Sequence, residues 1–203
     1  MHISITGRLG SGKSTVAKLL AESEGFEIYS TGAIQRRIAA DMGLTTLQMN
    51  QLMNSDHKYD HMLDDTVTKI SLERAADTLL FDSRMAWHFA RGSFKVYLFV
   101  DTAVAARRVI RDCRGDVECY ASVDDAIEQL NARMLVENAR YRELYGVDHL
   151  DLNNFDLVVN TENISPEKTC EIIMSEFNEY CKDPDAYVPP RMFYMDGAKT
   201  SVK

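Results

Sequence analysis

Runs of apolar residues alternate along the chain with stretches in which apolar residues recur at helical spacing. The runs predict five strands, at residues 2–6, 26–29, 78–82, 94–100 and 154–160. Helical spacing predicts helices between them, with the longest at residues 126–144 and 165–181. Strands that alternate with helices are typical of a parallel sheet covered by helices on both faces. We therefore predict an α/β fold, a three-layer α/β/α arrangement around a five-stranded parallel sheet.

The same pattern predicts a single domain at residues 1–181, with two insertions that we expect to be mobile, near residues 31–77 and 107–140. In the second insertion, Gly115 and several charged residues interrupt the helical spacing. Residues 182–203 form a tail that contains prolines and has no clear periodicity. Two states of the tail stay open, disorder and docking by its apolar residues Tyr187, Met192, Phe193 and Tyr194.

The length and net charge of the chain exclude some classes of protein. The chain has 203 residues, enough for one domain with a full core, and its formal net charge is −8 at pH 7. An acidic chain argues against a surface that coats nucleic acid, although it leaves room for a local basic pocket. No apolar run is long enough to cross a bilayer, and the first strand leaves no room for a signal peptide. We expect a cytoplasmic protein with no membrane partner, and a monomer is favoured.

The four cysteines stand at positions 113, 119, 170 and 181 and include no C-x-x-C pair. Reduced thiols are the ordinary state in the cytoplasm. Cys113 and Cys119 are close in sequence, but two ligands do not make a zinc site. Whether these two residues do more than pack stays open.

The clearest chemical signal lies between the first strand and the first helix, where the sequence matches G-x-x-x-x-G-K-[ST]. The matching residues are Gly7, Arg8, Leu9, Gly10, Ser11, Gly12, Lys13, Ser14 and Thr15. In such a loop, backbone N–H groups and the N-terminus of the following helix bind phosphate. Lys13 reaches the β- and γ-phosphates, and the Ser14 hydroxyl binds Mg²⁺. We therefore predict a site for the phosphates of a nucleotide.

Two further polar residues follow the buried strand at residues 78–82. Asp82 ends this strand, and Arg84 comes two residues later. In open α/β sheets the ligand binds outside the carboxyl ends of the strands, which predicts that both residues lie near Lys13. We expect Asp82 to hold Mg²⁺ directly or through water, with a simple strand-end cap as the alternative.

Charged side chains gather elsewhere as well. Four arginines lie on the two sides of the interrupted segment, and in an acidic chain this favours an anion clamp over a solvated surface: Arg107, Arg111, Arg133 and Arg140. Asp60 and Asp64 are four residues apart and share one helical face. That face is either solvated or in contact with a base or ribose.

Taken together, these segments resemble the nucleoside-monophosphate kinase superfamily, and most of all its short cytidylate kinases of the archaeal type. The resemblance covers about residues 1–180. It rests on the phosphate loop, on Ser30-Thr31-Gly32 with Arg36, on Ser83-Arg84, and on the segments 107–111, 133–141, 145–148 and 155–161. It departs from the usual pattern at Ser83, where glycine is common, and it lacks the longer acceptor insertion of bacterial members.

The resemblance implies ATP as phosphoryl donor, Mg²⁺ as cofactor, and CMP or dCMP as acceptor. The residues implied for the acceptor are Thr31, Arg36, Arg84, Arg133 and Glu137, to which the acidic face adds Asp60 and Asp64. The residues implied for the transferred phosphoryl group are Lys13, Arg107, Arg111 and Arg140. Residues near Asn160 and Thr161 are implied to lie against the donor adenine.

Other functions are compatible with part of this pattern of residues. Transfer to a phosphate needs no strong general base, because a phosphate acceptor is already ionised, and no obvious base is present. A kinase for AMP, another monophosphate or a hydroxyl compound such as shikimate or dephospho-coenzyme A is the main alternative; for a hydroxyl, Asp82 or Asp101 would take the proton. A non-catalytic nucleotide switch is a third interpretation, although the chain lacks N-K-x-D and matches D-x-x-G only formally, at residues 112–115.

Overall fold

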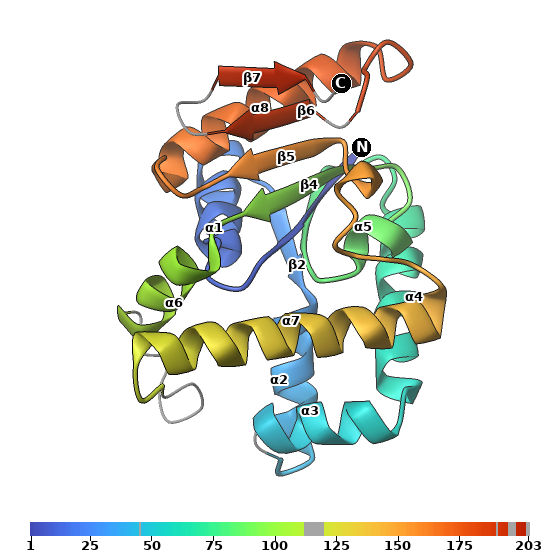
Figure 1. Ribbon diagram of the computed structural model, residues 1–203. Helices are drawn as coiled ribbons and strands as arrows, with labels where there is room; N and C mark the ends of the chain where they lie inside the picture. Colours follow the sequence, from blue (N-terminus) through green and yellow to red (C-terminus); the bar gives the residue numbers. More distant parts are fainter. Residues whose placement is uncertain (45, 112–119, 190, 195–197, 202–203) are drawn as a thin grey trace.

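The strands form one sheet in the computed structural model, which describes residues 1–44, 46–111, 120–189, 191–194 and 198–201 (Figure 1). Across the sheet the order is β2 (Glu27–Ser30), β3 (Leu79–Asp82), β1 (His2–Gly7), β4 (Ser93–Phe99), β5 (Leu157–Asn160), β6 (Arg191–Tyr194) and β7 (Ala198–Ser201). The helices are α1 (Lys13–Glu24), α2 (Thr31–Asp41), α3 (Thr46–Ser55), α4 (Lys58–Glu73), α5 (Ala86–Phe89), α6 (Thr102–Arg111), α7 (Val123–Tyr145) and α8 (Pro166–Lys182).

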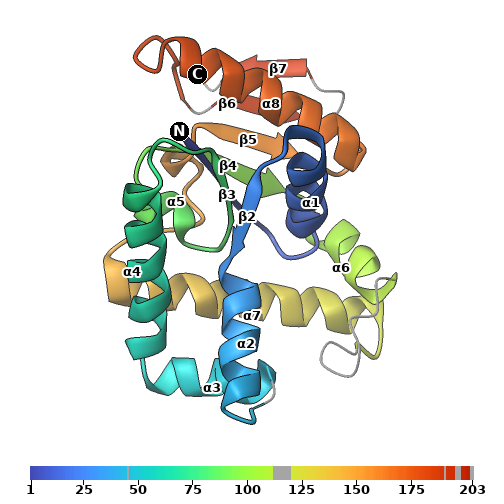
Figure 2. The same ribbon diagram turned by 180° about the vertical axis from the view of Figure 1, so that it is seen from behind.

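Apolar side chains of the central strands pack on both faces of the sheet, as expected for buried parallel strands. On one face, β-strand residues such as Ile3, Ile5 and Val96 pack with α1 and α8, which lie side by side (Figure 2). On the other face, Tyr97 and Phe81 belong to clusters that include residues of α4, α5 and α7. The predicted three-layer α/β/α class is confirmed.

The predicted number of strands was too small because the tail adds two. β6 pairs parallel with β5, and β7 pairs antiparallel with β6. The five expected strands are all parallel to their neighbours, as predicted. β6 has the short sequence Arg-Met-Phe-Tyr directly after two prolines, and β7 has the mainly polar sequence Ala-Lys-Thr-Ser, so neither was recognised as a strand. Of the tail residues expected to dock, Tyr187 and Met192 are buried.

A buried ion pair fastens this tail to α8. Glu176 is 1% exposed, and its Oε2 accepts hydrogen bonds from the Tyr187 hydroxyl and from Arg191 Nη1, both at 3.0 Å. Arg191 Nη1 also donates to Glu179 at 2.8 Å, and the guanidinium stacks on the Tyr187 ring. The tail therefore supplies the groups that compensate a carboxylate buried in the core.

We expect Arg191→Ala to lower the free energy of unfolding by about 3 kcal/mol, because a buried carboxylate loses its charge partner. Urea titration followed by far-UV circular dichroism measures this change. In the double variant Glu176→Gln/Arg191→Ala the buried charge is gone, and most of the loss should be recovered. A stability of Arg191→Ala equal to that of the parent would contradict the role of this pair.

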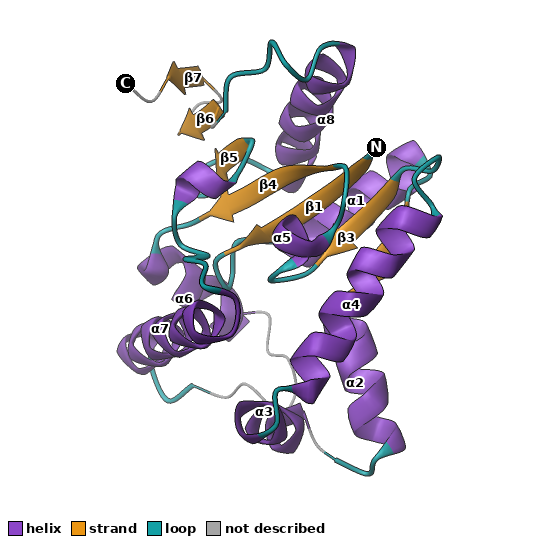
Figure 3. Ribbon diagram, turned by 90° about the vertical axis from the view of Figure 1, so that its right-hand side faces the viewer, coloured by secondary structure: helices purple, strands orange, loops and turns teal. Residues whose placement is uncertain are grey.

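Strand register brings the predicted site residues to one edge of the sheet. Asp82 is in register with Ile5 on β1 and with Ser30 on β2, so the carboxyl ends of three strands meet. In Figure 3 the arrowheads of β1 and β4 point toward α6 and α7, which lie beyond this edge. The loop after β1, the first turn of α2 and the segment after β3 therefore face the same space.

Among the described residues, no helix combines the length and the apolar composition that crossing a bilayer requires.

Candidate active site

A cavity of about 990 Å³ opens at this edge of the sheet. Its walls come from the phosphate loop, α1, α2, α4, the segment after β3, α6 and α7. Most of the residues predicted from the sequence for a site line it: Leu9, Gly10, Ser11, Gly12, Lys13, Ser14, Thr15, Thr31, Arg36, Asp60, Asp64, Asp82, Arg84, Arg111, Arg133, Glu137 and Arg140. The fold thus gathers residues from the whole length of the chain around one space.

Lys13 opens α1 and turns back over the phosphate loop. Its Nζ donates to the carbonyl oxygens of Gly7 at 3.0 Å and Arg8 at 2.9 Å. Burial, together with the nearby charge of Arg84, lowers the pKa of Lys13 well below its usual value. The Arg8 side chain takes no part in the cavity, since it stacks on Phe99 and donates to the Val100 carbonyl. Of the two cationic side chains in the phosphate loop, Lys13 therefore lines the cavity and Arg8 does not.

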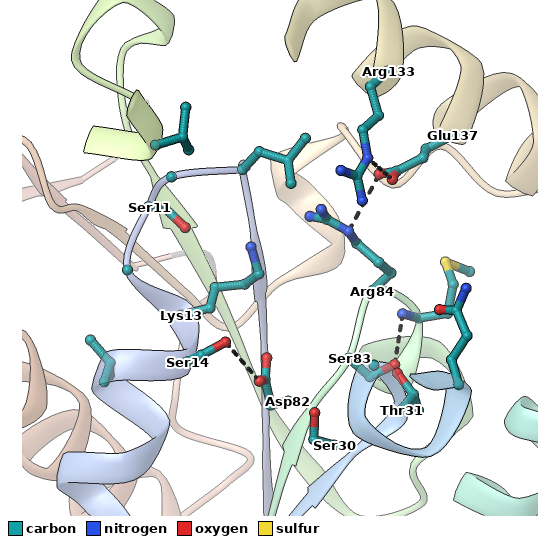
Figure 4. A pocket seen from close by; sticks show the side chains of 18 of the residues that line it. Ser11, Lys13, Ser14, Ser30, Thr31, Asp82, Ser83, Arg84, Arg133 and Glu137 are labelled. Atoms are coloured by element: carbon teal, nitrogen blue, oxygen red, sulfur yellow. Dashed lines mark hydrogen bonds and ion pairs between the residues drawn. The ribbon is translucent and has the colours of Figure 1, made fainter. Parts of the chain in front are cut away.

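The Ser14 hydroxyl and the Asp82 carboxylate face each other across this end of the cavity (Figure 4). Ser14 Oγ donates to Asp82 Oδ2 at 3.1 Å. A hydroxyl and a carboxylate beside a phosphate loop are the oxygen ligands that suit Mg²⁺, which commonly keeps several waters and takes one or two protein ligands. Among the described residues no group of three or more His, Cys, Asp or Glu side chains surrounds a point where a metal would sit. The residues present thus fit Mg²⁺ held jointly by protein and nucleotide phosphates.

Glu137 holds two arginines opposite the phosphate loop (Figure 4). Its Oε1 accepts from Arg133 Nε at 3.0 Å, and its Oε2 lies 3.3 Å from Arg84 Nε. Arg84 Nη1 also donates to the Gly7 carbonyl at 2.7 Å, so Arg84 connects α7 with the phosphate loop. Although burial alone would raise the pKa of Glu137, the charges of Arg84 and Arg133 lower it. The pair of guanidinium groups forms a fixed positive surface, which suits an anionic ligand.

The first turn of α2 adds hydroxyl groups to the same wall. Ser30 caps this helix, because its Oγ accepts from the backbone N–H of Ala33 at 3.4 Å. Thr31 and Arg36 line the cavity from this helix. Ser83, the position at which the resemblance led us to expect glycine, is buried, and its Oγ accepts from the Met85 N–H at 3.3 Å.

The two acids of α4 reach the cavity from another side. Asp60 Oδ1 lies 3.6 Å from Arg140 Nη2, and Asp64 Oδ2 accepts the Tyr145 hydroxyl at 2.5 Å. Both carboxylates are buried, at 6% and 7% exposed, so the interpretation as a solvated acidic face is wrong for these two residues. Burial raises the pKa of Asp60 and raises the pKa of Asp64 to about 7. Tyr145, 81 residues away from Asp64, was not identified from the sequence.

The raised pKa of Asp64 predicts a pH dependence of stability. Because the folded pKa lies above the ordinary value, folding favours the protonated acid, and that contribution is lost as the pH rises from about 4 through 7. We expect Asp64→Asn to remove this dependence, so that the stability of the parent relative to the variant falls by about 2 kcal/mol between pH 5 and pH 8. Chemical denaturation at four pH values measures the difference. Parallel curves for the two proteins would contradict the shift.

One arginine predicted for the lid does not reach the cavity. Arg107 is exposed on α6, whereas its neighbour Arg108 lines the cavity with Arg111. Arg108 donates to the carbonyl oxygens of Gly10 at 3.3 Å and Thr161 at 2.6 Å. Residue 108 follows the buried Ala105 by three positions and residue 107 does not, but the sequence alone does not show that Ala105 is buried. The central part of the lid, with Cys113 and Cys119, lies outside the described residues.

Residues after β5 also meet the phosphate loop. Thr161 Oγ1 donates to the Ser11 carbonyl at 3.1 Å, and Thr161 lines the cavity together with Ile164. Asn160 is buried, and its side chain accepts from the Glu162 N–H at 2.9 Å. This segment therefore closes the side of the cavity next to the phosphate loop, where the donor adenine was expected.

Known proteins resemble the chain over most of its length. The model of the cytidylate kinase-like family matches residues 2–163. A cytidylate kinase from Natronomonas pharaonis is 37% identical over 187 residues, which cover 91% of this chain and 93% of that protein. Cytidylate kinases from Thermoplasma volcanium and Sulfolobus acidocaldarius are 31% and 34% identical and cover 93% and 86% of this chain, and 97% and 92% of their own lengths.

Solved structures support the fold alone, because their sequences are distant. An uncharacterised protein from Eubacterium ventriosum has a TM-score of 0.65 at 14% identity, covering 88% of this chain and 98% of its own. A shikimate kinase from Bacteroides thetaiotaomicron has a TM-score of 0.58 at 14% identity, covering 90% and 98%. The sequence matches, which cover most of the chain, go further: this chain belongs to the cytidylate kinase-like family, among the nucleoside-monophosphate kinases.

Proposed function

We propose that this protein transfers the terminal phosphoryl group of ATP to CMP or dCMP, with Mg²⁺ as cofactor. One observation carries the proposal: Lys13 on the phosphate loop and the Arg84–Glu137–Arg133 cluster line one cavity from different elements. A cavity with two separate cationic groups suits a reaction between two phosphates. The names and identities of the curated relatives support cytidine nucleotides as acceptors.

The protein groups act by position and charge. Phosphoryl transfer needs the attacking and leaving oxygens in line, and neutralisation of charge on the equatorial oxygens. Lys13 and Arg111 are placed to supply that charge, while Arg84 and Arg133 orient the acceptor phosphate. Thr31 and Arg36 add contacts from α2. Mg²⁺, when bound by Ser14 and Asp82 together with the nucleotide, supplies charge neutralisation at the phosphates.

Asp82 argues against a hydroxyl acceptor. Such a reaction needs a carboxylate that takes the hydroxyl proton, and Asp82 was one of the two candidates. Its Oδ2 accepts a hydrogen bond from the Ser14 hydroxyl, next to the phosphate loop, which supports a role toward the donor phosphates instead. Asp101, the other candidate, is exposed, caps the Ala103 N–H at 2.8 Å and does not line the cavity. A monophosphate acceptor, already ionised, needs neither residue as a base.

A coupled assay of ADP release tests the proposal with ATP, Mg²⁺ and a panel of acceptors. The panel contains CMP, dCMP, UMP, AMP, GMP, dTMP, shikimate and dephospho-coenzyme A. We expect CMP and dCMP to give the highest kcat/KM. Turnover of shikimate or dephospho-coenzyme A without turnover of any monophosphate would overturn the proposal, and a preference for another monophosphate would overturn its finer part.

The role of Asp82 gives a separate prediction. We expect Asp82→Asn to lower kcat by about 10²-fold and to raise the Mg²⁺ concentration that gives half-maximal rate, because the metal loses a charged ligand. Asp41→Asn, at an exposed acid near the end of α2, is the matched control. A normal Mg²⁺ dependence in Asp82→Asn would leave only the strand-end cap as the role of this residue.

We also propose that the protein acts as a monomer in the cytoplasm. The free thiols of Cys170 and Cys181 fit a reducing compartment. Size-exclusion chromatography with light scattering tests the oligomeric state, and a dimeric mass would contradict this part.

A further inference from the structure

Helix α4 takes part in two separate apolar clusters, one in its first half and one in its second. In the first half, Leu63 packs with Ala39 of α2 and Met49 of α3. In the second half, Val67 packs with Phe81 of β3. Among the described residues the two clusters have no member in common, and in Figure 3 α4 runs between α3 and the sheet. The contacts of α4 between the clusters therefore help to set where α2 and α3 lie relative to the sheet.

A hydrogen bond joins α4 to α7 between these clusters. Tyr145, the last residue of α7, donates from its hydroxyl to Asp64 Oδ2 at 2.5 Å. Asp64 follows Leu63 directly and precedes Val67 by three positions, so the bond lies where α4 passes from one cluster to the other. Asp64 is buried, and a buried carboxyl group that loses its donor carries a desolvation cost. The bond therefore favours this placement of α4 against α7.

The ring of Tyr145 is fixed from two further directions. Its centroid lies 5.0 Å from that of Phe89 on α5 and 5.8 Å from that of His61 on α4, in both cases edge to face. Tyr145 is not among the described residues that line the cavity, whereas Asp64 is. Tyr145 thus acts on a ligand only through the elements that its hydroxyl holds together.

We propose that Tyr145 is a positioning residue: its hydroxyl fixes α4 against α7 and thereby sets how Arg36 on α2 stands relative to the two arginines that Glu137 holds. The inference rests on the proposed function, since the acceptor phosphate would bind between these two walls of the cavity. A wall that is already in place binds a ligand without the cost of ordering α2 and α3. Loss of the hydroxyl should therefore weaken acceptor binding and leave donor binding almost unchanged, because the phosphate loop lies between β1 and α1.

Tyr145→Phe tests this directly, because it removes the hydroxyl and keeps the ring contacts. With ATP and Mg²⁺ we expect KM for CMP to rise by about tenfold, while kcat and KM for ATP stay within about twofold. Isothermal titration calorimetry with CMP should show the same loss of affinity without any turnover. Tyr180→Phe is the matched control and should keep the parent values, since Tyr180 packs in the cluster of α1 and α8 on the other face of the sheet.

Hydrogen exchange followed by mass spectrometry measures the placement of the helices itself. In Tyr145→Phe the amides of α2 and α3 should exchange about tenfold faster, whereas those of α1 and α8 should keep the parent rates. Two substitutions at Asp64 separate the hydrogen bond from the packing. Asp64→Asn keeps an oxygen that accepts the Tyr145 hydroxyl and should keep the slow exchange of α2 and α3, whereas Asp64→Leu should lose it as Tyr145→Phe does.

The outcomes separate this inference from the proposed function. An unchanged KM and Kd for CMP in Tyr145→Phe would overturn the inference, and so would an equal rise of KM for CMP and for ATP. Faster exchange in α1 and α8 as well would also overturn it, because it would show a general loss of stability. A parent that binds CMP but transfers no phosphoryl group would overturn the proposed function, while weaker CMP binding by Tyr145→Phe would still support the role of Tyr145.

Discussion

If the proposed function holds, Lys13→Ala should lower kcat for CMP phosphorylation by about 10³-fold or more, because the loop then presents no cation to the transferred phosphoryl group. Within the described residues, the ammonium group donates hydrogen bonds to the carbonyl oxygens of Gly7 and Arg8, so we expect its removal to leave the apolar core intact. Steady-state kinetics at saturating ATP and CMP measures the loss. Circular dichroism and thermal unfolding should give curves close to those of the parent.

The matched control for this prediction is Lys18→Ala. Lys18 is exposed on the same helix, α1, five residues further along, and does not line the cavity. Its removal changes the net charge by the same amount and should leave kcat within about twofold, as is usual for surface substitutions. Full activity of Lys13→Ala would show that this lysine does not support catalysis, and it would overturn the role proposed for it.

Gly7→Ala should prevent stable folding, with a loss of about 4 kcal/mol or more. Gly7 is in register with Leu98 on β4 and has φ of 143°. A Cβ atom at this position would lie 2.1 Å from the Leu98 carbonyl oxygen and 2.7 Å from the Leu98 nitrogen. Both are backbone atoms of the central sheet, so they cannot move aside as a flexible side chain would. Backbone strain and overpacking therefore both contribute to the loss of stability.

Gly25→Ala provides the comparison for this effect. Gly25 caps the end of α1 with a positive φ of 71°, but a Cβ there would meet no atom within 4 Å. Its cost should be about 1 kcal/mol, from backbone conformation alone. Urea unfolding of both variants, or the soluble yield where Gly7→Ala does not fold, distinguishes the two causes. Equal stabilities would mean that steric contact with β4 contributes nothing.

The parts of the fold that sequence could predict are those encoded by neighbouring residues. The phosphate loop is contiguous, and the rule that ligands bind at the carboxyl ends of strands placed Asp82 and Arg84 beside it before any coordinates. β6 and β7 were missed because β6 depends on pairing with β5, and β7 in turn depends on pairing with β6. The same holds for Tyr145 and Asp64, whose contact joins α7 to α4 and has no local signal.

The choice between Arg107 and Arg108 shows a subtler limit. Both residues lie on α6, and a count of arginines in the segment does not separate them. Only the packing of Ala105 and Ala106 against Val100 and Leu130 shows which side of α6 faces the core, and hence that Arg108 and not Arg107 turns toward the phosphate loop. Charge composition therefore predicted that an anion site exists, while packing determined which residues form it.

The buried bonds between Glu176, Tyr187 and Arg191 have a consequence for how this sequence can change over time. A chain that keeps glutamate at position 176 cannot lose its last segment without losing the hydrogen bonds from Tyr187 and Arg191 to this buried carboxylate. A shortened descendant is expected to acquire a neutral residue at that position first. Relatives that end before the equivalents of Tyr187 and Arg191 should thus carry an uncharged side chain there, so that one helix position records whether a lineage has kept the tail.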